Sequence, residues 1–262
     1  MATTFGWPHR HFRVVDSTNT RARELAAAGA PGGTVVTAGE QTEGRGRQGR
    51  SWTAPADKAL LYSAIVRPLE RRHVLLPLAA PLAVAETAEA LAPGLECGLK
   101  WPNDVLVGRR KLAGILIEGR PRDGWAVVGV GLNLTIAAAE FPEELRERAT
   151  SVAIERSSLP PQSRPRPRPA GVRSSGRMGS EGANAGREAA RALSARLGRW
   201  LEAEEEEILA AWRQRDALRG REVAWEGGSG IADGIDERGY LVVIAGGERV
   251  TVGAGEVHLT RS

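Results

Sequence analysis

Residues 157–186 interrupt the chain with a stretch in which almost nothing could pack into a hydrophobic core. Proline, glycine, serine and arginine dominate its sequence, SSLPPQSRPRPRPAGVRSSGRMGSEGANAG. This composition supplies too little apolar surface to offset the entropy of ordering a backbone. Any core must therefore form from the segments on either side, and we expect residues 157–186 to be a disordered, solvated insertion.

The segment before this insertion alternates between strand and helix signals. Helices are predicted over residues 20–28, which follow a cluster of capping side chains, and over residues 75–91, where Pro81 is expected to kink the helix or delay its start. Strands are predicted from short runs rich in apolar and β-branched residues, namely 12–15, 34–37, 59–66, 111–118 and 125–134, and a turn at 100–104 leads into another.

After the insertion, apolar residues recur at near-helical spacing from Leu193 to Trp212. We expect one helix there, with the acidic run Glu204–Glu207 on its solvated face. From Arg221 to Leu259, three β-like runs (Glu222–Trp225, Tyr240–Ile244 and Arg249–Val252) alternate with glycine turns. This pattern predicts a small, separate β-barrel or sandwich.

Charge and cysteine content restrict the classes of function. The net charge is +4, but five arginines lie within residues 160–180, and without them 31 basic residues face 32 acidic ones. A near-neutral body argues against a nucleic-acid-binding protein. Cys97 is the only cysteine, and the longest apolar run, Val74–Ala85, is short and contains two prolines. We therefore expect a cytoplasmic protein without a disulfide, a signal peptide or a membrane span.

Lysine is rare in this chain. Of 36 basic residues only Lys58, Lys100 and Lys111 are lysines. An ammonium group is a compact point charge, whereas a guanidinium group is a wide planar fork. Lys100 and Lys111 therefore become candidates for positions where arginine cannot serve.

Residues 44–50, GRGRQGR, fit the pattern G-x-G-x-x-G. A dinucleotide site would need this pattern to open a helix, yet SWTAP and then a strand follow. Glycines that let the backbone approach phosphates, together with arginines that supply forked hydrogen bonds, predict instead a mobile loop that closes over an anion. An exposed basic loop without a ligand is the alternative.

Three further motifs carry polar groups at turns: DSTN (16–19), KWPND with the following KLAG (100–104 and 111–114), and VGVGLN (128–133). The first is a helix cap whose free N–H groups are also able to receive the polar head of a small ligand. In the second, a lysine beside a reacting carboxylate and phosphate would neutralise developing charge. In the third, two glycines within a strand would let a ligand approach the backbone closely. Taken singly, each of these motifs is more often only a helix cap, a hairpin with surface charges or a tightly packed strand.

In combination and in this order, the motifs resemble those of the biotin–protein ligase family. The resemblance covers nearly all of the chain outside residues 157–186, and the pair GRGRQGR and KWPNDVLVGRRKLAG is highly specific. It implies an α+β fold in two parts. A catalytic domain, 1–216, would have a central mixed β-sheet flanked by helices, and residues 217–262 would form a small SH3-like β-barrel domain.

The resemblance also implies roles for individual residues. Lys111, Arg45 and Arg47 would be catalytic, and Asp104 would hold a metal ion. The nucleotide would be bound by Trp52, Lys100, Asn103 and Asn133. The biotin pocket would be formed by Ser17, Thr18, Asn19, Gln41, Arg45, Gly46, Arg47, Lys111, Gly114 and Leu116.

The implied reaction uses ATP and biotin as substrates, with Mg²⁺. Biotinyl-5′-AMP forms first, and a lysine of a biotin carboxyl carrier domain then accepts the biotin. Because only about fifteen residues precede the DSTN motif, a DNA-binding repressor role is not expected. The resemblance leaves open a monomer or a homodimer. A lipoate or octanoate transferase and a biotin-binding protein without activity are the alternatives.

Overall fold

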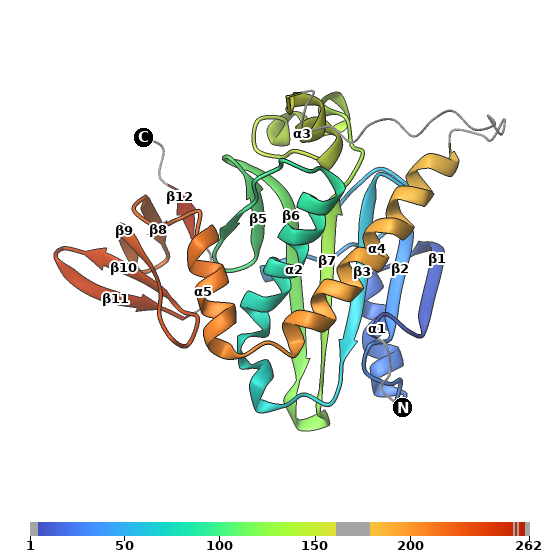
Figure 1. Cartoon of the computed structure of the whole chain (residues 1–262), viewed down its shortest axis with the longest axis horizontal. Helices are drawn as coiled ribbons and strands as arrows, with labels where there is room; N and C mark the ends of the chain where they lie inside the picture. Colours follow the sequence, from blue (N-terminus) through green and yellow to red (C-terminus); the bar gives the residue numbers. More distant parts are fainter. Residues whose placement is uncertain (1–4, 161–178, 254, 256, 260–262) are drawn as a thin grey trace.

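The computed structural model describes residues 5–160, 179–253, 255 and 257–259. Its centre is a seven-stranded mixed sheet in the order β1-β2-β3-β7-β6-β5-β4 (Figure 1). β1 pairs with β2 in parallel, and the other pairs are antiparallel. The strands are β1 (His9–Val15), β2 (Val35–Gln41), β3 (Ala59–Val66), β4 (Gly98–Lys100), β5 (Asp104–Val107), β6 (Arg110–Arg120) and β7 (Trp125–Asn133). The expected α+β class with a mixed central sheet is confirmed.

Alternation along the central strands gives the sheet two different faces, because successive side chains of a strand point to opposite sides. Val128, Val130 and Leu132 of β7 belong to the main hydrophobic cluster, which also contains residues of α2 (Leu76–Leu91) and α4 (Gly179–Leu201). Val127 instead packs with α1 (Thr18–Ala27) on the other face. Gly129, Gly131 and Asn133 share this α1 face with Val127.

The helix α2 is the central packing element of the first face. Pro77 lies in its first turn and Pro81 lies inside it, so Pro81 does not delay its start. One segment, Arg71–Leu91, has the length and hydropathy of a membrane span, but 67% of its most apolar window is buried in the molecule. α4 crosses α2 on the same face of the sheet (Figure 1). A core helix covered by another helix accounts for this apolar run.

The expected single helix after the insertion is wrong, because two helices occupy this region. α4 ends at Leu201, and α5 (Glu205–Arg215) follows after a short break. Glu205, Glu206 and Glu207 form the first turn of α5, where carboxylates interact favourably with the positive end of the helix dipole. The acidic run therefore lies at the start of a helix and not on the solvated face of a longer one.

Both ends of the predicted insertion, residues 157–186, are helical in the structure. Ser157 and Ser158 end α3 (Val152–Ser158), and residues 179–186 form the first turns of α4. Ala185 packs against the main hydrophobic cluster, and Gly182 lies so close to the turn before β3 that a Cβ atom would approach the Asp57 carbonyl oxygen to 2.6 Å. Small residues thus allow close packing here. Residues 161–178 lie outside the described residues, so the prediction of disorder is untested there.

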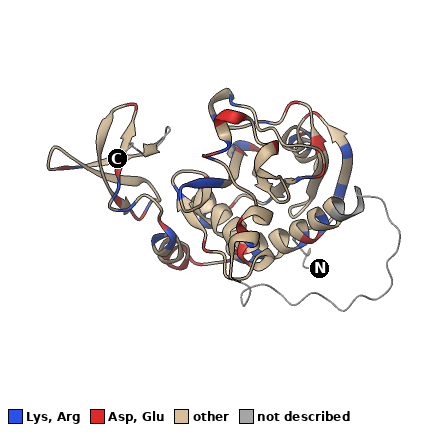
Figure 2. Cartoon of the chain, turned by 90° about the horizontal axis from the view of Figure 1, so that it is seen from above, with Lys and Arg blue, Asp and Glu red and all other residues tan. Residues whose placement is uncertain are grey.

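The C-terminal part is a five-stranded antiparallel sheet in the order β11-β10-β9-β8-β12, seen at one side of the molecule in Figures 1 and 2. Its strands are β8 (Glu222–Trp225), β9 (Gly228–Ile235), β10 (Leu241–Ala245), β11 (Glu248–Val252) and β12 (His258–Leu259). The three predicted runs are confirmed. β9 was expected to be a glycine turn, and instead its glycines lie within the ladder, where a Cβ on Gly230 would meet the Ile244 carbonyl oxygen at 2.3 Å.

The two sheets share one hydrophobic cluster. It contains core residues of the first sheet together with Leu218, Val223, Leu241 and Val243. The indole N–H of Trp101 in the KWPND turn donates to the Gly239 carbonyl oxygen at 3.0 Å. The small sheet is therefore packed against the turn that carries Lys100, Asn103 and Asp104. The domain boundary at 216/217 and the SH3-like topology stay predictions.

Candidate active site

The predicted site residues converge on the α1 face of the central sheet. On β6, Ala113 and Ile115 belong to the main hydrophobic cluster, so Gly114, Leu116 and Glu118 lie on the opposite face. β6 pairs with β7 in a register that places Gly114 beside Gly131 and Leu116 beside Gly129. Gly114, Gly129 and Gly131 thus form a glycine floor, which is bordered on β6 by Leu116 and Glu118.

The DSTN segment begins α1 above this floor. Ser17 is the N-cap, and Ser17, Thr18 and Asn19 are buried. The backbone N–H and the hydroxyl of Thr18 both donate to Gln41 Oε1, at 2.8 and 2.9 Å. Asp16 pairs with Arg21, and this hydrogen bond lowers the pKa of the Asp16 carboxyl. The buried polar groups of the predicted biotin pocket are therefore held by hydrogen bonds within the protein.

The glycines of β7 receive protein side chains. A Cβ atom on Gly129 would lie 2.0 Å from Asn19 Oδ1, and one on Gly131 would lie 2.2 Å from the Trp52 ring. The close approach that these glycines allow was expected for a ligand. In the structure, the space above Gly129 is occupied by the side chain of Asn19, and the space above Gly131 is occupied by the ring of Trp52.

The arginine loop folds back across the same face. The loop itself contains one 3₁₀ turn, Arg47–Gly49, and no helix lies between this turn and β3. The glycine pattern therefore does not open a helix, which rules out the dinucleotide interpretation. The Gly46 N–H donates to the Arg50 carbonyl oxygen at 2.7 Å, and the Trp52 N–H donates to the Gly44 carbonyl oxygen at 2.9 Å. These bonds close the loop and set Trp52 against Gly131 and Gly114.

Lys111 lies at the edge of the floor beside Trp52. Its Nζ forms an ion pair of 2.6 Å with Asp104 Oδ1, while Lys100 Nζ is 3.9 Å from Asp104 Oδ2. Lys111 Nζ is also 5.8 Å from the centre of the Trp52 ring. Its backbone is fixed by the N–H bond to the Arg148 carbonyl oxygen and by the Thr150 N–H bond to its own carbonyl oxygen. Two of the three lysines thus flank one carboxylate.

Asn103 directly precedes Asp104 in the chain, and Asn133 contacts a segment that pairs with Lys111. Asn103 Nδ2 donates to the Ile115 carbonyl oxygen at 2.9 Å, and its Oδ1 accepts from Arg47 at 3.3 Å. Arg47 also donates to the Gly255 carbonyl oxygen of the C-terminal part at 3.4 Å. Asn133 is buried and donates to the Thr150 carbonyl oxygen at 2.9 Å, so it fixes the segment whose backbone pairs with Lys111.

Two residues of this arrangement were missed by the sequence analysis. Ser63 on β3 is fully buried, and its hydroxyl donates to Asn19 Oδ1 at 2.6 Å and lies 2.8 Å from Thr18 Oγ1. Glu118 on β6 accepts hydrogen bonds from Asn19 and Arg23 and forms an ion pair with Arg45. The signal available was strand alternation, which places a polar side chain of each strand on the site face.

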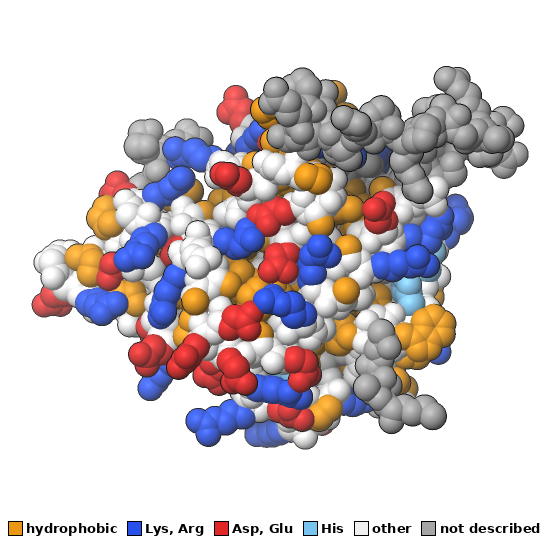
Figure 3. Space-filling model, viewed as in Figure 1, with side chains coloured by type: hydrophobic (Ala, Val, Ile, Leu, Met, Phe, Trp, Pro, Cys, Tyr) orange, Lys and Arg blue, Asp and Glu red, His pale blue; other side chains and the backbone are white. Residues whose placement is uncertain are grey.

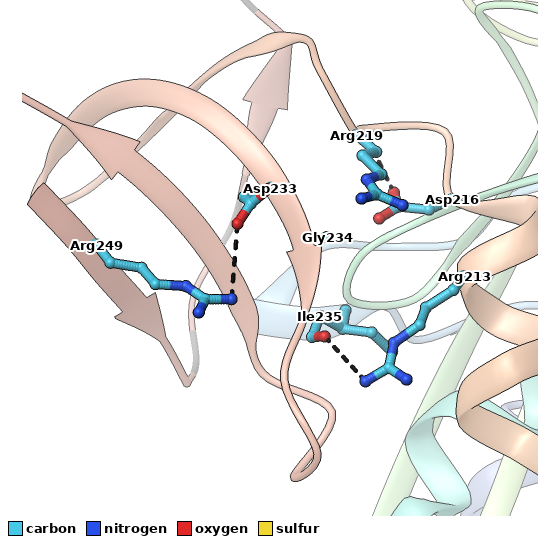
Figure 4. Close-up of a pocket in the computed structure, with 7 residues that line it drawn as sticks. All are labelled: Arg213, Asp216, Arg219, Asp233, Gly234, Ile235 and Arg249. Atoms are coloured by element: carbon cyan, nitrogen blue, oxygen red, sulfur yellow. Dashed lines mark hydrogen bonds and ion pairs between the residues drawn. The ribbon is translucent and has the colours of Figure 1, made fainter. Parts of the chain in front are cut away.

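Among the described residues, the Cys97 thiol and a polar cavity in the C-terminal part lie apart from this site. Burial raises the pKa of the Cys97 thiol to about 12, which keeps it protonated and unsuited to nucleophilic catalysis. Figure 4 shows a cavity of about 240 Å³ between the end of α5 and β9, lined by Arg213, Asp216, Arg219, Asp233, Gly234, Ile235 and Arg249. None of the predicted site residues lines it.

The comparisons with known proteins agree with this geometry. Residues 11–134 match the biotin/lipoate A/B protein ligase family, and residues 219–259 match the biotin protein ligase C-terminal domain. A biotin–[acetyl-CoA-carboxylase] ligase of Mycobacterium tuberculosis is 37% identical over 96% of this chain and 89% of its own length. The chain belongs to the biotin protein ligase family.

Two further relatives extend the likeness. A biotin–[acetyl-CoA-carboxylase] ligase of Paracoccus denitrificans is 33% identical over 92% of this chain and 96% of its own length. A biotin protein ligase of Aquifex aeolicus, solved in complex with biotin and ATP, superposes with a TM-score of 0.73 at 27% identity and covers 97% of this chain and 99% of its own. The family and the fold predicted from the motifs are confirmed.

Proposed function

We propose that this chain activates biotin with ATP to form biotinyl-5′-AMP and transfers the biotin to a lysine of an acceptor protein. The observation that carries the proposal is that Lys111, the arginine loop and a polar wall converge on one glycine floor. The wall consists of the buried Thr18 and Asn19 together with the half-buried Gln41. A relative that covers nearly the whole chain was solved with biotin and ATP bound.

In the first step, an oxygen of the biotin carboxylate attacks the α-phosphorus of ATP. The bond from that phosphorus to the bridging oxygen of the β-phosphate breaks, and pyrophosphate leaves. Two anionic groups approach each other in this step, so neutralisation of their charge lowers the barrier. Lys111 and the guanidinium groups of Arg45 and Arg47 supply this charge, while the floor and Trp52 orient the reactants.

In the second step, the neutral amine of the acceptor lysine attacks the acyl carbon of the mixed anhydride. The bond from this carbon to the phosphate oxygen breaks, AMP leaves, and the new amide nitrogen loses a proton. No covalent intermediate with the protein is needed, which agrees with the buried and protonated Cys97. The arginine loop would exclude water from the anhydride until the acceptor arrives.

The donor atoms around Asp104 fit a metal ion that arrives with the nucleotide. Among the described residues, no group of three His, Cys, Asp or Glu side chains is placed to hold a metal. Asp104 is a single carboxylate already paired with Lys111. Mg²⁺ commonly uses one or two carboxylates together with substrate phosphates. Asp104 would therefore hold Mg²⁺ only jointly with ATP.

The acceptor we propose is the biotin carboxyl carrier domain of a biotin-dependent carboxylase. Support comes from the two relatives named as ligases for acetyl-CoA carboxylase. Acidic and basic side chains are interspersed on the face seen in Figure 3, which gives no sign there of a basic nucleic-acid-binding surface. We further propose that the reaction takes place in the cytoplasm. A monomer or a homodimer remains the prediction for the oligomeric state.

Exchange of label between pyrophosphate and ATP tests the proposal, with biotin, lipoate and octanoate each supplied as the acid. Exchange with biotin alone is expected, followed by biotinylation of a carrier domain in the presence of ATP. Exchange with lipoate or octanoate and not with biotin would contradict the proposed substrate. Tight binding of biotin without exchange would leave a binding protein and overturn the proposed activity.

A further inference from the structure

Glu118 stands where the predicted biotin pocket meets the arginine loop. It lies near the outer end of β6, and its side chain is only 21% exposed. Its Oε2 accepts from Asn19 Nδ2 at 2.9 Å, and its Oε1 is 3.1 Å from Arg23 NH1 and 3.2 Å from Arg45 NH1. Two elements, α1 and the arginine loop, thus meet on one carboxylate.

The contacts of Asn19 extend this junction into the pocket. Its Oδ1 accepts from Ser63, whose hydroxyl also touches Thr18 Oγ1, and Thr18 donates to Gln41. The side chain has no alternative orientation, because Oδ1 faces a hydroxyl donor and Nδ2 faces a carboxylate. A Cβ on Gly129 would close the space that Asn19 occupies. Polar contacts therefore run without a gap from Gln41 to Arg45.

We propose that Glu118 is a positioning residue that orders the biotin pocket and the arginine loop as one unit. Its carboxylate fixes the amide of Asn19 in the pocket wall and holds Arg45 close to the floor before any ligand binds. A loop held in this way loses less conformational freedom on binding, which strengthens affinity. The expected effect on biotin binding rests on the proposed function. The expected effect on the ligand-free loop does not.

Glu118→Gln tests the proposal, because the amide keeps an oxygen for Asn19 and removes the charge that holds Arg45. Two measurements are made on the full chain: hydrogen exchange of residues 43–52 without ligand, and ATP–pyrophosphate exchange over a range of biotin concentrations. We expect faster amide exchange in the loop and a KM for biotin raised about 5- to 20-fold, the effect of one partly buried charged hydrogen bond. The kcat should change by less than about twofold, since Lys111, the lysine proposed to act at the reacting groups, is held by its own ion pair with Asp104.

Matched variants separate this role from a general loss of structure. Glu24→Gln breaks an exposed ion pair with Arg21 on the same helix and should change neither measurement. Arg23→Gln removes the other guanidinium from Glu118 and should leave the loop protected. If Arg23→Gln reproduced the effect of Glu118→Gln, or if Glu118→Gln changed nothing, the proposal would be wrong.

A double variant, Glu118→Gln with Arg45→Gln, tests whether the two residues act through each other. If Glu118 acts on the loop through Arg45, then Glu118→Gln should add little to the rise in KM that Arg45→Gln causes. Fully additive effects would show that the two residues act separately and would overturn the proposal. Absence of exchange in the unchanged protein would instead overturn the proposed function, while the loop measurement would still decide the role of Glu118.

Discussion

Lys111 is held from both sides, by the ion pair of its ammonium group with Asp104 and by backbone hydrogen bonds to residues 148 and 150. Lys111→Ala removes the charge that offsets the approach of two anions, so we expect biotin-dependent ATP–pyrophosphate exchange to fall by about 100- to 1,000-fold or more. Near-normal exchange would remove Lys111 from the mechanism.

Lys111→Arg distinguishes charge from shape at the same position. The Cε and Nζ atoms of Lys111 lie 3.2 and 3.3 Å from where a Cβ of Gly114 would be, which leaves little room for a planar guanidinium. We therefore expect exchange to fall by roughly 10-fold or more, as for the loss of a well-placed charge interaction. Lys58→Arg is the matched control, because Lys58 forms an exposed ion pair with Glu140, and it should leave the rate unchanged.

Arg47 joins the loop to two other parts of the molecule, through Asn103 Oδ1 and the Gly255 carbonyl oxygen. Arg47→Gly removes both contacts and adds backbone freedom to a loop that is already rich in glycine. We expect the half-life of biotinyl-5′-AMP on the protein to shorten, by roughly 10-fold for hydrogen bonds of this strength. The half-life is measured by rapid dilution of the protein–adenylate complex and by following the adenylate released into solution. An unchanged half-life would count against a closing loop.

At the scale of elements, the strands were predictable and the helix breaks were not. Continuous runs of apolar and β-branched residues mark β3 and β7, because both strands are buried on two faces. β9 was missed because its glycines are required by close contact with β10, which no local pattern reports. The break between α4 and α5 depends on packing of apolar residues on both sides, so periodicity alone joins the two helices.

The same limit applies to the site. The motifs identified Lys111, the arginine loop and the DSTN cap, since each has a chemical signature within a few residues of sequence. Ser63 and Glu118 have none, because their partners lie on other elements: Asn19 for Ser63, and Arg45 with Asn19 for Glu118. The glycines of β7 were correctly expected to allow close approach, but what approaches them is decided by the tertiary fold.

Gly129→Ala tests this close approach at the scale of a strand. The new methyl group would lie 2.0 Å from Asn19 Oδ1, so Asn19 must leave its bonds to Ser63 and Glu118. We expect the KM for biotin to rise by roughly 5- to 100-fold, the cost of overpacking a filled space. Gly119→Ala on β6 is the matched control, since its Cβ would meet only Pro121 at 3.8 Å; an equal effect of the two changes would contradict the assigned geometry.

At the scale of the whole molecule, the two sheets are joined by packing as well as by the chain. The hydrophobic cluster is continuous across them, and the turn between β9 and β10 lies against the start of α2. Trp101 in the KWPND turn donates to Gly239 at the same place. Because the contact is buried and apolar, we expect the parts to unfold together in one transition rather than in two.

Gly239→Ala tests this coupling. Gly239 has a φ of 79°, and a Cβ there would lie 2.9 Å from Leu78 Cδ1. The left-handed backbone costs alanine about 1–2 kcal/mol, and the contact with α2 adds roughly 1–3 kcal/mol. Gly246 also has a positive φ, 59°, and a Cβ there would have nothing within 4 Å. Gly246→Ala should therefore show the backbone cost alone.

Urea denaturation followed by tryptophan fluorescence measures the stability of both variants. A larger loss of stability for Gly239→Ala, still in a single transition, is the expected result. Equal losses would mean that the turn does not press on α2, and a second transition confined to Gly239→Ala would mean that the C-terminal sheet unfolds independently of the sheet that carries the site.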